Sequence, residues 1–294
     1  MSEHTAPLPA YIDMHLHVGR VFIEDAEGIT PEMALSYLDL VGIEKAVLLS
    51  VENPEETSFF VLTDQVMEVC QAHPTRFIPF CNVDPRIASG DNSRVIYHRI
   101  AEYVQRGCKG FGEELSGLPV DDVRLQHIYA ACGEFGLPIT LHLDAERNLD
   151  EVGLPGLERM LQQFPQTVFI GHAMHFWSEI SGDITPAEFS AYPNRPVAPG
   201  GALPRLFDTY PNLYGDLSAG SGLNALRRDP DFAMPFLERY QDRLCFATDA
   251  CVVAHFSQMP GMATFLQTAL QDGAISTTAY RKIARENAER VLGL

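Results

Sequence analysis

The chain has 294 residues, 46% of them hydrophobic and 20% charged, so it can bury the core of one large barrel or of two modest domains. Its 39 acidic and 21 basic side chains give a formal net charge of -18, which disfavours nucleic acid or an anionic membrane surface as a partner. We expect a cytoplasmic protein, because the sequence shows no signal-peptide pattern, no run of about 20 apolar residues and no C-x-x-C pair among its six cysteines.

Short runs rich in β-branched and aromatic residues alternate with segments of helical length. Eight such runs are expected to be strands, and they begin near residues 11, 45, 77, 108, 138, 167, 213 and 244. Residues 31–41 predict a helix with Thr30 as its N-cap and Pro31 at its first position, and residues 121–135 predict another. Residues 275–294 predict a closing helix that starts near Thr277 or Thr278.

Strict alternation of eight strands with helices, at intervals of roughly 30 residues, is typical of a parallel (β/α)8 barrel, the TIM barrel. It fits an open doubly wound sheet less well. The interval between strands six and seven holds an extra stretch, residues 177–201, which we expect to be an elaborated loop that covers the barrel mouth. No repeat or linker marks a boundary, so we expect a single domain over residues 1–294.

His15 and His17 lie two residues apart in the first predicted strand, so their side chains project from the same face. Imidazole is a common metal ligand, and the pair would supply half of a metal site; the alternative is a pair of structural or surface histidines. Other polar residues end further strands, where the active sites of TIM barrels lie. They are Glu113, Glu114, His142, Asp144, His172, His175 and Asp249. This clustering favours the metal site.

Four motifs together resemble the amidohydrolase superfamily of metal-dependent hydrolases, and especially its amidohydrolase-related TIM-barrel branch. They are Asp13-Met-His-Leu-His17, Leu141-His-Leu143, Gly171-His172 and Phe246-Ala-Thr-Asp249, and they span nearly the whole chain. The resemblance implies that His15, His17, His142 and Asp249 are metal ligands. It also implies that His172 binds a second metal or the substrate and its transition state, and that Asp249 accepts a proton from metal-bound water.

The chemistry of these residues agrees with the implied roles. A divalent cation, with zinc favoured and manganese as the alternative, lowers the pKa of bound water towards about 7 and polarises a carbonyl group. Asp249 can take the proton and return it to a leaving amine or alkoxide, although its position after Thr248 also suits a helix N-cap. The prediction is a metal-dependent hydrolase that cleaves a C–N or C–O bond in a small carboxylated or cyclic compound.

Glu113 stands where many superfamily members with two metals carry a carboxylated lysine. Lys109 precedes Glu113 by four residues and would lie about 13 Å deeper in the barrel, so it is not expected to be the bridge. Glu113 is therefore predicted to bind one metal or to bridge two, with His142 and His172 completing the second position. Alternatively Glu113 only accepts a hydrogen bond from a ligand histidine, or Glu114 is the inward residue.

Five residues are candidates for binding a small-molecule substrate: Arg20, Asp144, His175, Trp177 and Ser218. Arg20 would pair with an anionic group, and Ser218 would hydrogen-bond a ligand unless it serves a turn. Asp144 would bind substrate, orient a ligand or cap a loop. His175 and Trp177 would line the pocket beneath the long loop unless they pack in the core. A homo-oligomer is compatible with the sequence.

Three alternatives to the hydrolase stay open. A nonoxidative decarboxylase of the same branch uses a similar ligand set and would release carbon dioxide rather than an amine, an alcohol or a second acid. A metal-dependent deoxyribonuclease resembling the TatD family carries a strand-four glutamate reminiscent of Gly112-Glu113, but the negative charge of the chain disfavours it. A catalytically silent metal-binding or scaffolding barrel is disfavoured by the intact set of candidate ligands.

Overall fold

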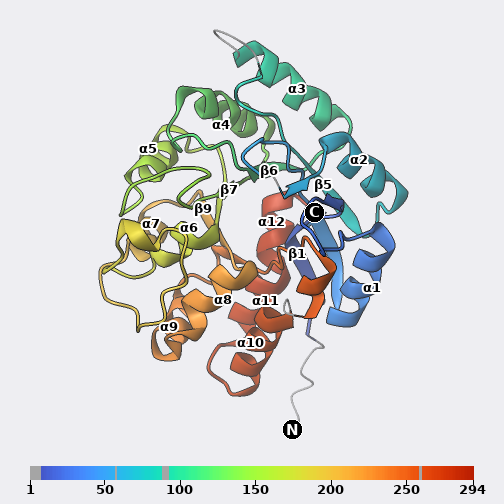
Figure 1. Ribbon diagram of the computed structural model, residues 1–294. Helices are drawn as coiled ribbons and strands as arrows, with labels where there is room; N and C mark the ends of the chain where they lie inside the picture. Colours follow the sequence, from blue (N-terminus) through green and yellow to red (C-terminus); the bar gives the residue numbers. More distant parts are fainter. Residues whose placement is uncertain (1–7, 57, 88–92, 258–259) are drawn as a thin grey trace.

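Eight parallel strands form a barrel in the computed structural model, which describes residues 8–56, 58–87, 93–257 and 260–294 (Figure 1). Their order in the sheet follows the chain: β1 (Tyr11–Leu16), β3 (Ile43–Leu48), β5 (Phe77–Cys81), β6 (Gly110–Glu114), β7 (Ile139–His142), β8 (Phe169–His172), β9 (Leu213–Asp216) and β10 (Leu244–Cys245). The ring closes where Met14 N donates to Phe246 O at 3.1 Å and Leu16 bridges Ala250. The predicted TIM barrel is confirmed.

Helices surround the strands (Figure 1). They are α1 (Pro31–Val41), α2 (Thr63–Ala72), α3 (Ser93–Gln105), α4 (Val123–Phe135), α5 (Pro155–Gln163), α6 (Ala173–Ser178), α7 (Ala202–Thr209), α8 (Ala219–Arg227), α9 (Pro230–Arg239), α10 (Pro260–Gln271), α11 (Thr277–Arg281) and α12 (Asn287–Leu292). Helix α1 begins as predicted, because the Thr30 hydroxyl accepts a hydrogen bond from Met33 N. Helix α4 begins later than predicted, because Asp122 is its N-cap. Among the described residues, no helix is long and apolar enough to cross a membrane.

The predicted alternation with helices holds for the eight barrel strands, and the structure adds elements that were not predicted. Strands β2 (Arg20–Val21) and β4 (Phe59–Phe60) form an additional antiparallel pair. Two helices, α6 and α7, lie between β8 and β9, and two more, α8 and α9, lie between β9 and β10. Strands of two residues are too short to produce an alternating pattern, which explains why the β2–β4 pair was not predicted.

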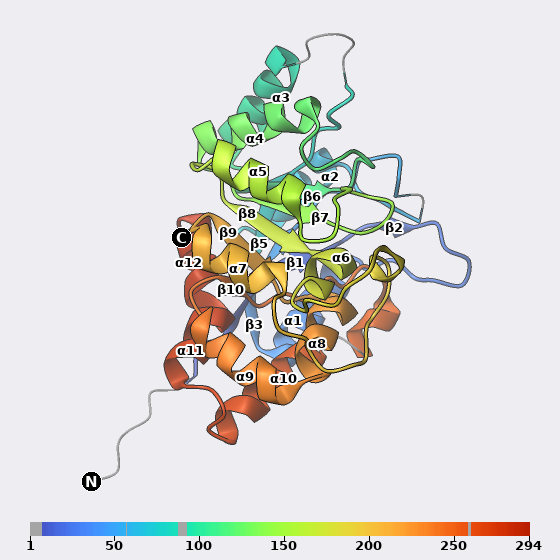
Figure 2. The ribbon, with the colours of Figure 1, turned by 90° about the vertical axis from the view of Figure 1, so that its left-hand side faces the viewer.

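The C-terminal segment closes one end of the barrel. The predicted helix over residues 275–294 consists of α11, a π-helical turn (Lys282–Glu286) and α12, and its N-cap is Ser276. Ala288 and Leu292 of α12 pack against Ile12 in the barrel interior, whereas the larger apolar core lies between the strands and the outer helices. Figure 2 shows α12 and β2 on opposite sides of the barrel. The C-terminal ends of the strands are thus the end left for a functional site.

The predicted loop, residues 177–201 of the stretch between β8 and α7, begins inside α6 and contains one short 3-10 helix (Pro186–Glu188). Arg195 holds it together through ion pairs with Asp183 and Glu188. The stretch also contacts its neighbours, because Asn224 of α8 donates to Pro193 O at 2.8 Å and the loop after β7 donates to Ser190. Its role as a cover of the barrel mouth stays a prediction.

Candidate metal centre

Four side chains from three parts of the barrel bring their donor atoms together. His15 and His17 come from the end of β1, Glu113 from β6 and Asp249 from the loop after β10. The two Nε2 atoms of the histidines lie 2.9 Å apart. Glu113 Oε2 lies 3.4 Å from His15 Nε2 and 3.3 Å from His17 Nε2. Asp249 Oδ1 lies 3.3 Å and 3.4 Å from the same two atoms.

These distances fit a small divalent cation. Metal–ligand bonds of about 2.0–2.1 Å place the ligand atoms of a tetrahedral zinc site about 3.3–3.4 Å apart. The four nitrogen–oxygen distances are 3.3 or 3.4 Å, and the nitrogen–nitrogen distance is shorter, at 2.9 Å. The donor set of two imidazoles and two carboxylates is also one that divalent transition metals bind.

The hydrogen-bond partner of Nδ1 in each histidine determines whether its Nε2 can bind a metal. His15 Nδ1 lies 2.6 Å from Asp216 Oδ2, and His17 Nδ1 lies 3.2 Å from the carbonyl oxygen of Leu49. Because these partners are acceptors, each Nδ1 carries the proton and each Nε2 turns a lone pair towards the other. Two lone pairs and two carboxylates facing one another need positive charge between them, which a divalent metal ion supplies. The residues therefore fit a divalent metal ion.

Charge within the centre shifts the titration of its members. Burial alone lowers the pKa of His15, but the Asp249 and Glu113 carboxylates raise it well above its ordinary value. Burial alone raises the pKa of Asp249, yet His15 and His17 hold it below its ordinary value. Protons on the imidazoles thus balance the carboxylates when no cation is bound, and metal binding releases them.

Glu113 and Asp249 each offer a second oxygen to a neighbouring group of donors. Glu113 Oε1 lies 2.6 Å from His142 Nδ1 and 3.8 Å from His172 Nε2. Asp249 Oδ2 lies 3.4 Å from the same nitrogen of His172. Glu113, His142 and His172 form a second candidate metal-binding group. The two carboxylates therefore span both groups.

Of the two adjacent glutamates, Glu113 is the one in the centre. Glu114 is buried elsewhere, where its Oε1 accepts a hydrogen bond from Ser116 N at 2.9 Å. Lys109 is exposed and lines a different cavity together with Lys45 and Leu294. The structure thus places Glu113 in the predicted position and Lys109 away from it.

His142 contacts carboxylates through both ring nitrogens. Its Nε2 lies 3.1 Å from Asp144 Oδ2, and its Nδ1 contacts Glu113. Asp144 is 1% exposed and also accepts hydrogen bonds from Arg147 N at 2.6 Å and Arg147 Nη1 at 2.7 Å. Asp144 therefore orients His142 and caps its own loop, and its oxygens face these partners.

Asp216, to which the sequence analysis gave no role, organises the far side of the centre. Besides His15, it binds Ser218, whose backbone N donates to Asp216 Oδ1 at 2.7 Å. The indole of Trp177 donates to the carbonyl oxygen of Asp216 at 2.7 Å. The hydroxyl of Ser218 lies 2.9 Å from His172 Nδ1. Asp216 stands at the end of β9, and this position was the sequence signal that could have identified it.

The predicted substrate-binding residues lie in different surroundings. Trp177 is 1% exposed and Ser218 is buried, so both support the centre from behind. His175 is also buried, and its ring stacks on Phe189 with centroids 3.5 Å apart. The structure places His175 and Trp177 in packed interior positions, and neither lines the cavity that opens beside the metal-binding donors. Arg20 is exposed on β2, with its guanidinium over the ring of Phe22.

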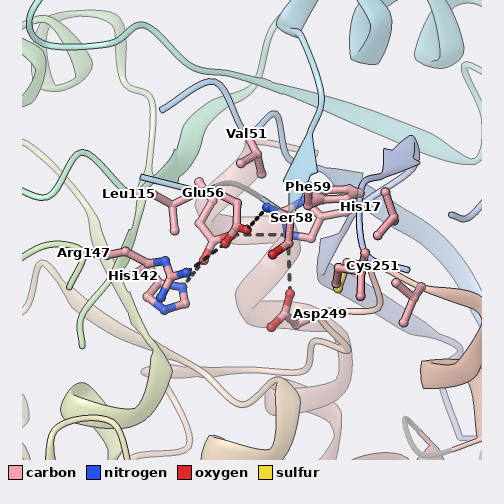
Figure 3. A pocket seen from close by; sticks show the side chains of 14 residues that line it. His17, Val51, Glu56, Ser58, Phe59, Leu115, His142, Arg147, Asp249 and Cys251 are labelled. Carbon is pink, nitrogen blue, oxygen red and sulfur yellow. Dashed lines mark hydrogen bonds and ion pairs between the residues drawn. The ribbon is translucent and has the colours of Figure 1, made fainter. Parts of the chain in front are cut away.

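A cavity of about 250 Å³ opens beside the metal-binding donors. Its lining residues are His17, Val21, Ile23, Val51, Glu56, Ser58, Phe59, Glu113, Leu115, His142, Arg147, Asp249, Cys251 and Val252. Figure 3 shows His142 and Arg147 on one side of the cavity and His17 and Cys251 on the other. The sequence analysis missed Glu56, Phe59 and Arg147, because they lie on loops and a short strand without a motif.

Three non-glycine residues that follow strands adopt left-handed backbone conformations. They are Ala173 after β8, Ala219 after β9 and Asp249 after β10, with φ of 78°, 55° and 54°. Such conformations are costly for residues with a Cβ and concentrate at functional sites. Asp249 does not cap a helix, because the next helical turn begins only at Val253. The backbone there instead directs its carboxylate towards the histidines.

The barrel and its centre of histidines and carboxylates define the class of protein: a TIM-barrel enzyme of the metal-dependent kind. A family model described as amidohydrolase matches residues 12–294. The chain therefore belongs to the amidohydrolase family, and its function is of the metal-dependent amidohydrolase type. The resemblance found in the motifs is thus confirmed. No curated protein sequence is similar enough to the chain to count as a match.

Solved structures share the fold at low sequence identity. An uncharacterized TIM-barrel protein from Bordetella bronchiseptica is 18% identical, with a TM-score of 0.66 and 96% of this chain and 98% of that chain covered. A probable 2-pyrone-4,6-dicarboxylic acid hydrolase from Acinetobacter baumannii is 14% identical, with a TM-score of 0.60 and coverage of 97% and 100%. A 5-carboxyvanillate decarboxylase from Novosphingobium aromaticivorans, complexed with manganese, is 13% identical, with a TM-score of 0.61 and coverage of 98% and 96%.

Proposed function

We propose that the chain is a hydrolase that uses metal-activated water to cleave a C–N or C–O bond in a small carboxylated or cyclic substrate. The observation that carries this proposal is the placement of Asp249. Its Oδ1 belongs to the four-atom cluster, and its Oδ2 lies 3.4 Å from His172 Nε2. One carboxylate thus reaches both the metal-binding donors and a second polar group beside the cavity.

When bound by these residues, a divalent cation would supply an activated water and would polarise a carbonyl group of the substrate. Asp249 takes a proton from the attacking water and returns it to the leaving amine or alkoxide. His172, held by Ser218, hydrogen-bonds the oxygen on which negative charge develops. The apolar residues on the cavity wall exclude water from the rest of the substrate and orient it.

The donor set is compatible with Zn²⁺ or Mn²⁺, and with one ion or two. His15, His17, Glu113 and Asp249 would hold the first ion. In the two-ion alternative, the second ion would use the remaining oxygen of Glu113 together with His142 and His172, and His172 would then bind the metal instead of the substrate oxygen. For this second position His142 would exchange its contact with Glu113 for a bond to the metal.

A nonoxidative decarboxylase is the second candidate, because solved decarboxylases share the fold. They include the 5-carboxyvanillate enzyme and a 2,6-dihydroxybenzoate decarboxylase from Rhizobium that is 16% identical. We favour the hydrolase because bond cleavage by water requires a proton acceptor beside the metal site. Asp249 has this position, since its carboxylate contacts His17 on one side and His172 on the other.

Metal analysis of the purified protein, followed by a substrate panel, tests both candidates. The protein, reconstituted with Zn²⁺ or Mn²⁺, is supplied with lactones, cyclic amides and aromatic acids. Appearance of a new acid, alcohol or amine, abolished by a chelator and restored by metal, supports the hydrolase. Carbon dioxide as the product supports the decarboxylase. Failure to bind either metal in a titration contradicts both.

A further inference from the structure

Glu56 and Arg147 form an ion pair on the wall of the cavity. Arg147 Nη2 lies 3.0 Å from Glu56 Oε2, and Arg147 Nη1 lies 2.7 Å from Asp144 Oδ2. Both Glu56 and Arg147 line the cavity that contains His17 and Asp249 (Figure 3). Asp144 and His142 lie between the pair and Glu113, so Arg147 does not contact that metal-binding carboxylate directly.

The guanidinium of Arg147 already pairs with two carboxylates. Each of its terminal nitrogens faces a carboxylate, and its Nε is buried without a hydrogen-bond partner. Glu56 is also held in place, because its Oε1 accepts a hydrogen bond from Ser58 N at 2.8 Å. The side chains of Arg147 and Glu56 are 20% and 18% exposed, so water screens their interaction only in part.

The positive charge of Arg147 is already paired with the carboxylates of Glu56 and Asp144. Among the described residues that line the cavity, Arg147 is the one lysine or arginine. A ligand carboxylate that approached Arg147 would also approach the negative charge of Glu56, and it would displace an ion pair already formed. Most of the other lining residues are apolar, including Val51, Phe59 and Leu115, and they suit an uncharged body.

We propose that Glu56 is a specificity-determining residue. By pairing with Arg147, it makes the cavity prefer substrates whose end remote from the metal is uncharged over substrates that carry a carboxylate there. This inference rests on the proposed function, since it assumes that the reacting group of the substrate faces the metal-binding donors. It narrows the substrate class to compounds with an uncharged remote end.

Two hydroxamic acids that differ only at the remote end test the proposal. Benzohydroxamic acid and 4-carboxybenzohydroxamic acid carry the same metal-binding group, and calorimetry measures their affinities for the zinc-loaded protein. We expect the wild type to bind the uncharged compound at least tenfold more tightly. Glu56→Gln keeps the size and the Ser58 hydrogen bond but removes the carboxylate that faces Arg147 Nη2, while Asp144 still pairs with Nη1. The preference should therefore fall at least tenfold, mainly through tighter binding of the carboxylated compound.

Glu146→Gln is the matched control. Glu146 Oε2 lies 3.9 Å from Arg147 Nη1, but its side chain is 78% exposed and it does not belong to the cavity wall. The same change of charge there should alter the preference less than twofold. Thermal unfolding followed by circular dichroism verifies that both variants fold.

The outcomes separate this inference from the proposed function. Equal shifts in Glu56→Gln and Glu146→Gln would overturn the inference, because general electrostatics would then explain them. Tighter or equal binding of the carboxylated compound by the wild type would also overturn it. If neither compound binds any of the folded, zinc-supplied proteins, the metal centre itself is refuted and the inference falls with it.

Discussion

The two ring nitrogens of His15 contact different partners, and this arrangement fixes which nitrogen faces the metal-binding donors. Asp216 accepts the Nδ1 proton at 2.6 Å and leaves Nε2 free to face the other donors. Asp216 is in turn fixed by Ser218 and Trp177, which both donate to it. A carboxylate behind a metal-binding histidine increases the basicity of the imidazole and fixes its orientation. Trp177 and Ser218 thus contribute to the centre without lining the cavity.

Asp249→Asn should lower turnover far more than it weakens substrate binding. The amide keeps the size of the side chain but cannot accept a proton, and loss of one acid–base group costs about 10²–10⁴-fold in rate. Steady-state kinetics at matched metal occupancy measure kcat and KM separately. Near-wild-type kcat in a variant that retains its metal would show that another group accepts the proton.

Glu113→Gln should reduce the metal content of the protein. The amide is a weaker ligand than the carboxylate, so one equivalent is lost if Glu113 bridges two ions, and affinity falls if it binds one. Calorimetric titration with zinc measures both quantities. Glu114→Gln is the control, because the Glu114 side chain contacts Ser116 rather than the donors. Unchanged stoichiometry and affinity in Glu113→Gln would remove Glu113 from the metal site.

At the level of elements, the stretch between β8 and α7 depends on charge. Arg195 hydrogen-bonds Asp183 and Glu188 and lowers the pKa of each to about 2. Unfolded Asp and Glu titrate near pH 3.9 and about 4.3, so the stabilisation is present above about pH 4 and is lost as the pH falls towards 2. Hydrogen exchange of residues 183–197, corrected for intrinsic rates, should therefore increase a few-fold over this range.

Arg195→Gln tests the same stretch at neutral pH. The variant should exchange as fast at pH 6 as the acidified wild type does, and it should show little further change on acidification. Arg239→Gln, which breaks an exposed pair with Asp208 on other helices, is the control. Unaltered exchange in Arg195→Gln would show that apolar contacts, not these ion pairs, hold the stretch.

The sequence predicted the eight barrel strands, and it missed the short strands β2 and β4 and the additional helices. Eight apolar runs and the N-cap of α1 are local signals; the runs located the barrel and the ends of its strands. The sequence alone left Glu114 open as an alternative to Glu113, because the pairing of β6 with β7 is irregular between Phe111 and Glu114 and breaks the period of two. Arg147 and Glu56 lie 91 residues apart, and no local pattern relates them.

For the whole molecule, the metal centre joins distant parts of the chain. Its donors come from β1, β6 and the segment after β10, so a bound cation connects the first strand to the last. Without a cation, buried carboxylates and imidazoles must balance one another through protons. Because the unfolded chain cannot present this set of ligands, binding of the metal should stabilise the fold.

Removal of the metal should therefore lower the melting temperature. At a free metal concentration of 100 times Kd, binding contributes about 2.7 kcal/mol, which corresponds to a shift of about 5 °C for a chain of this size. Differential scanning calorimetry of chelator-treated protein, before and after addition of zinc or manganese, measures it. His17→Ala should lose the metal-dependent shift. His98→Ala, an exposed histidine of α3, should retain it. Equal melting temperatures of the wild type with and without metal would contradict the coupling, because a cation held by β1, β6 and the last loop must resist their separation.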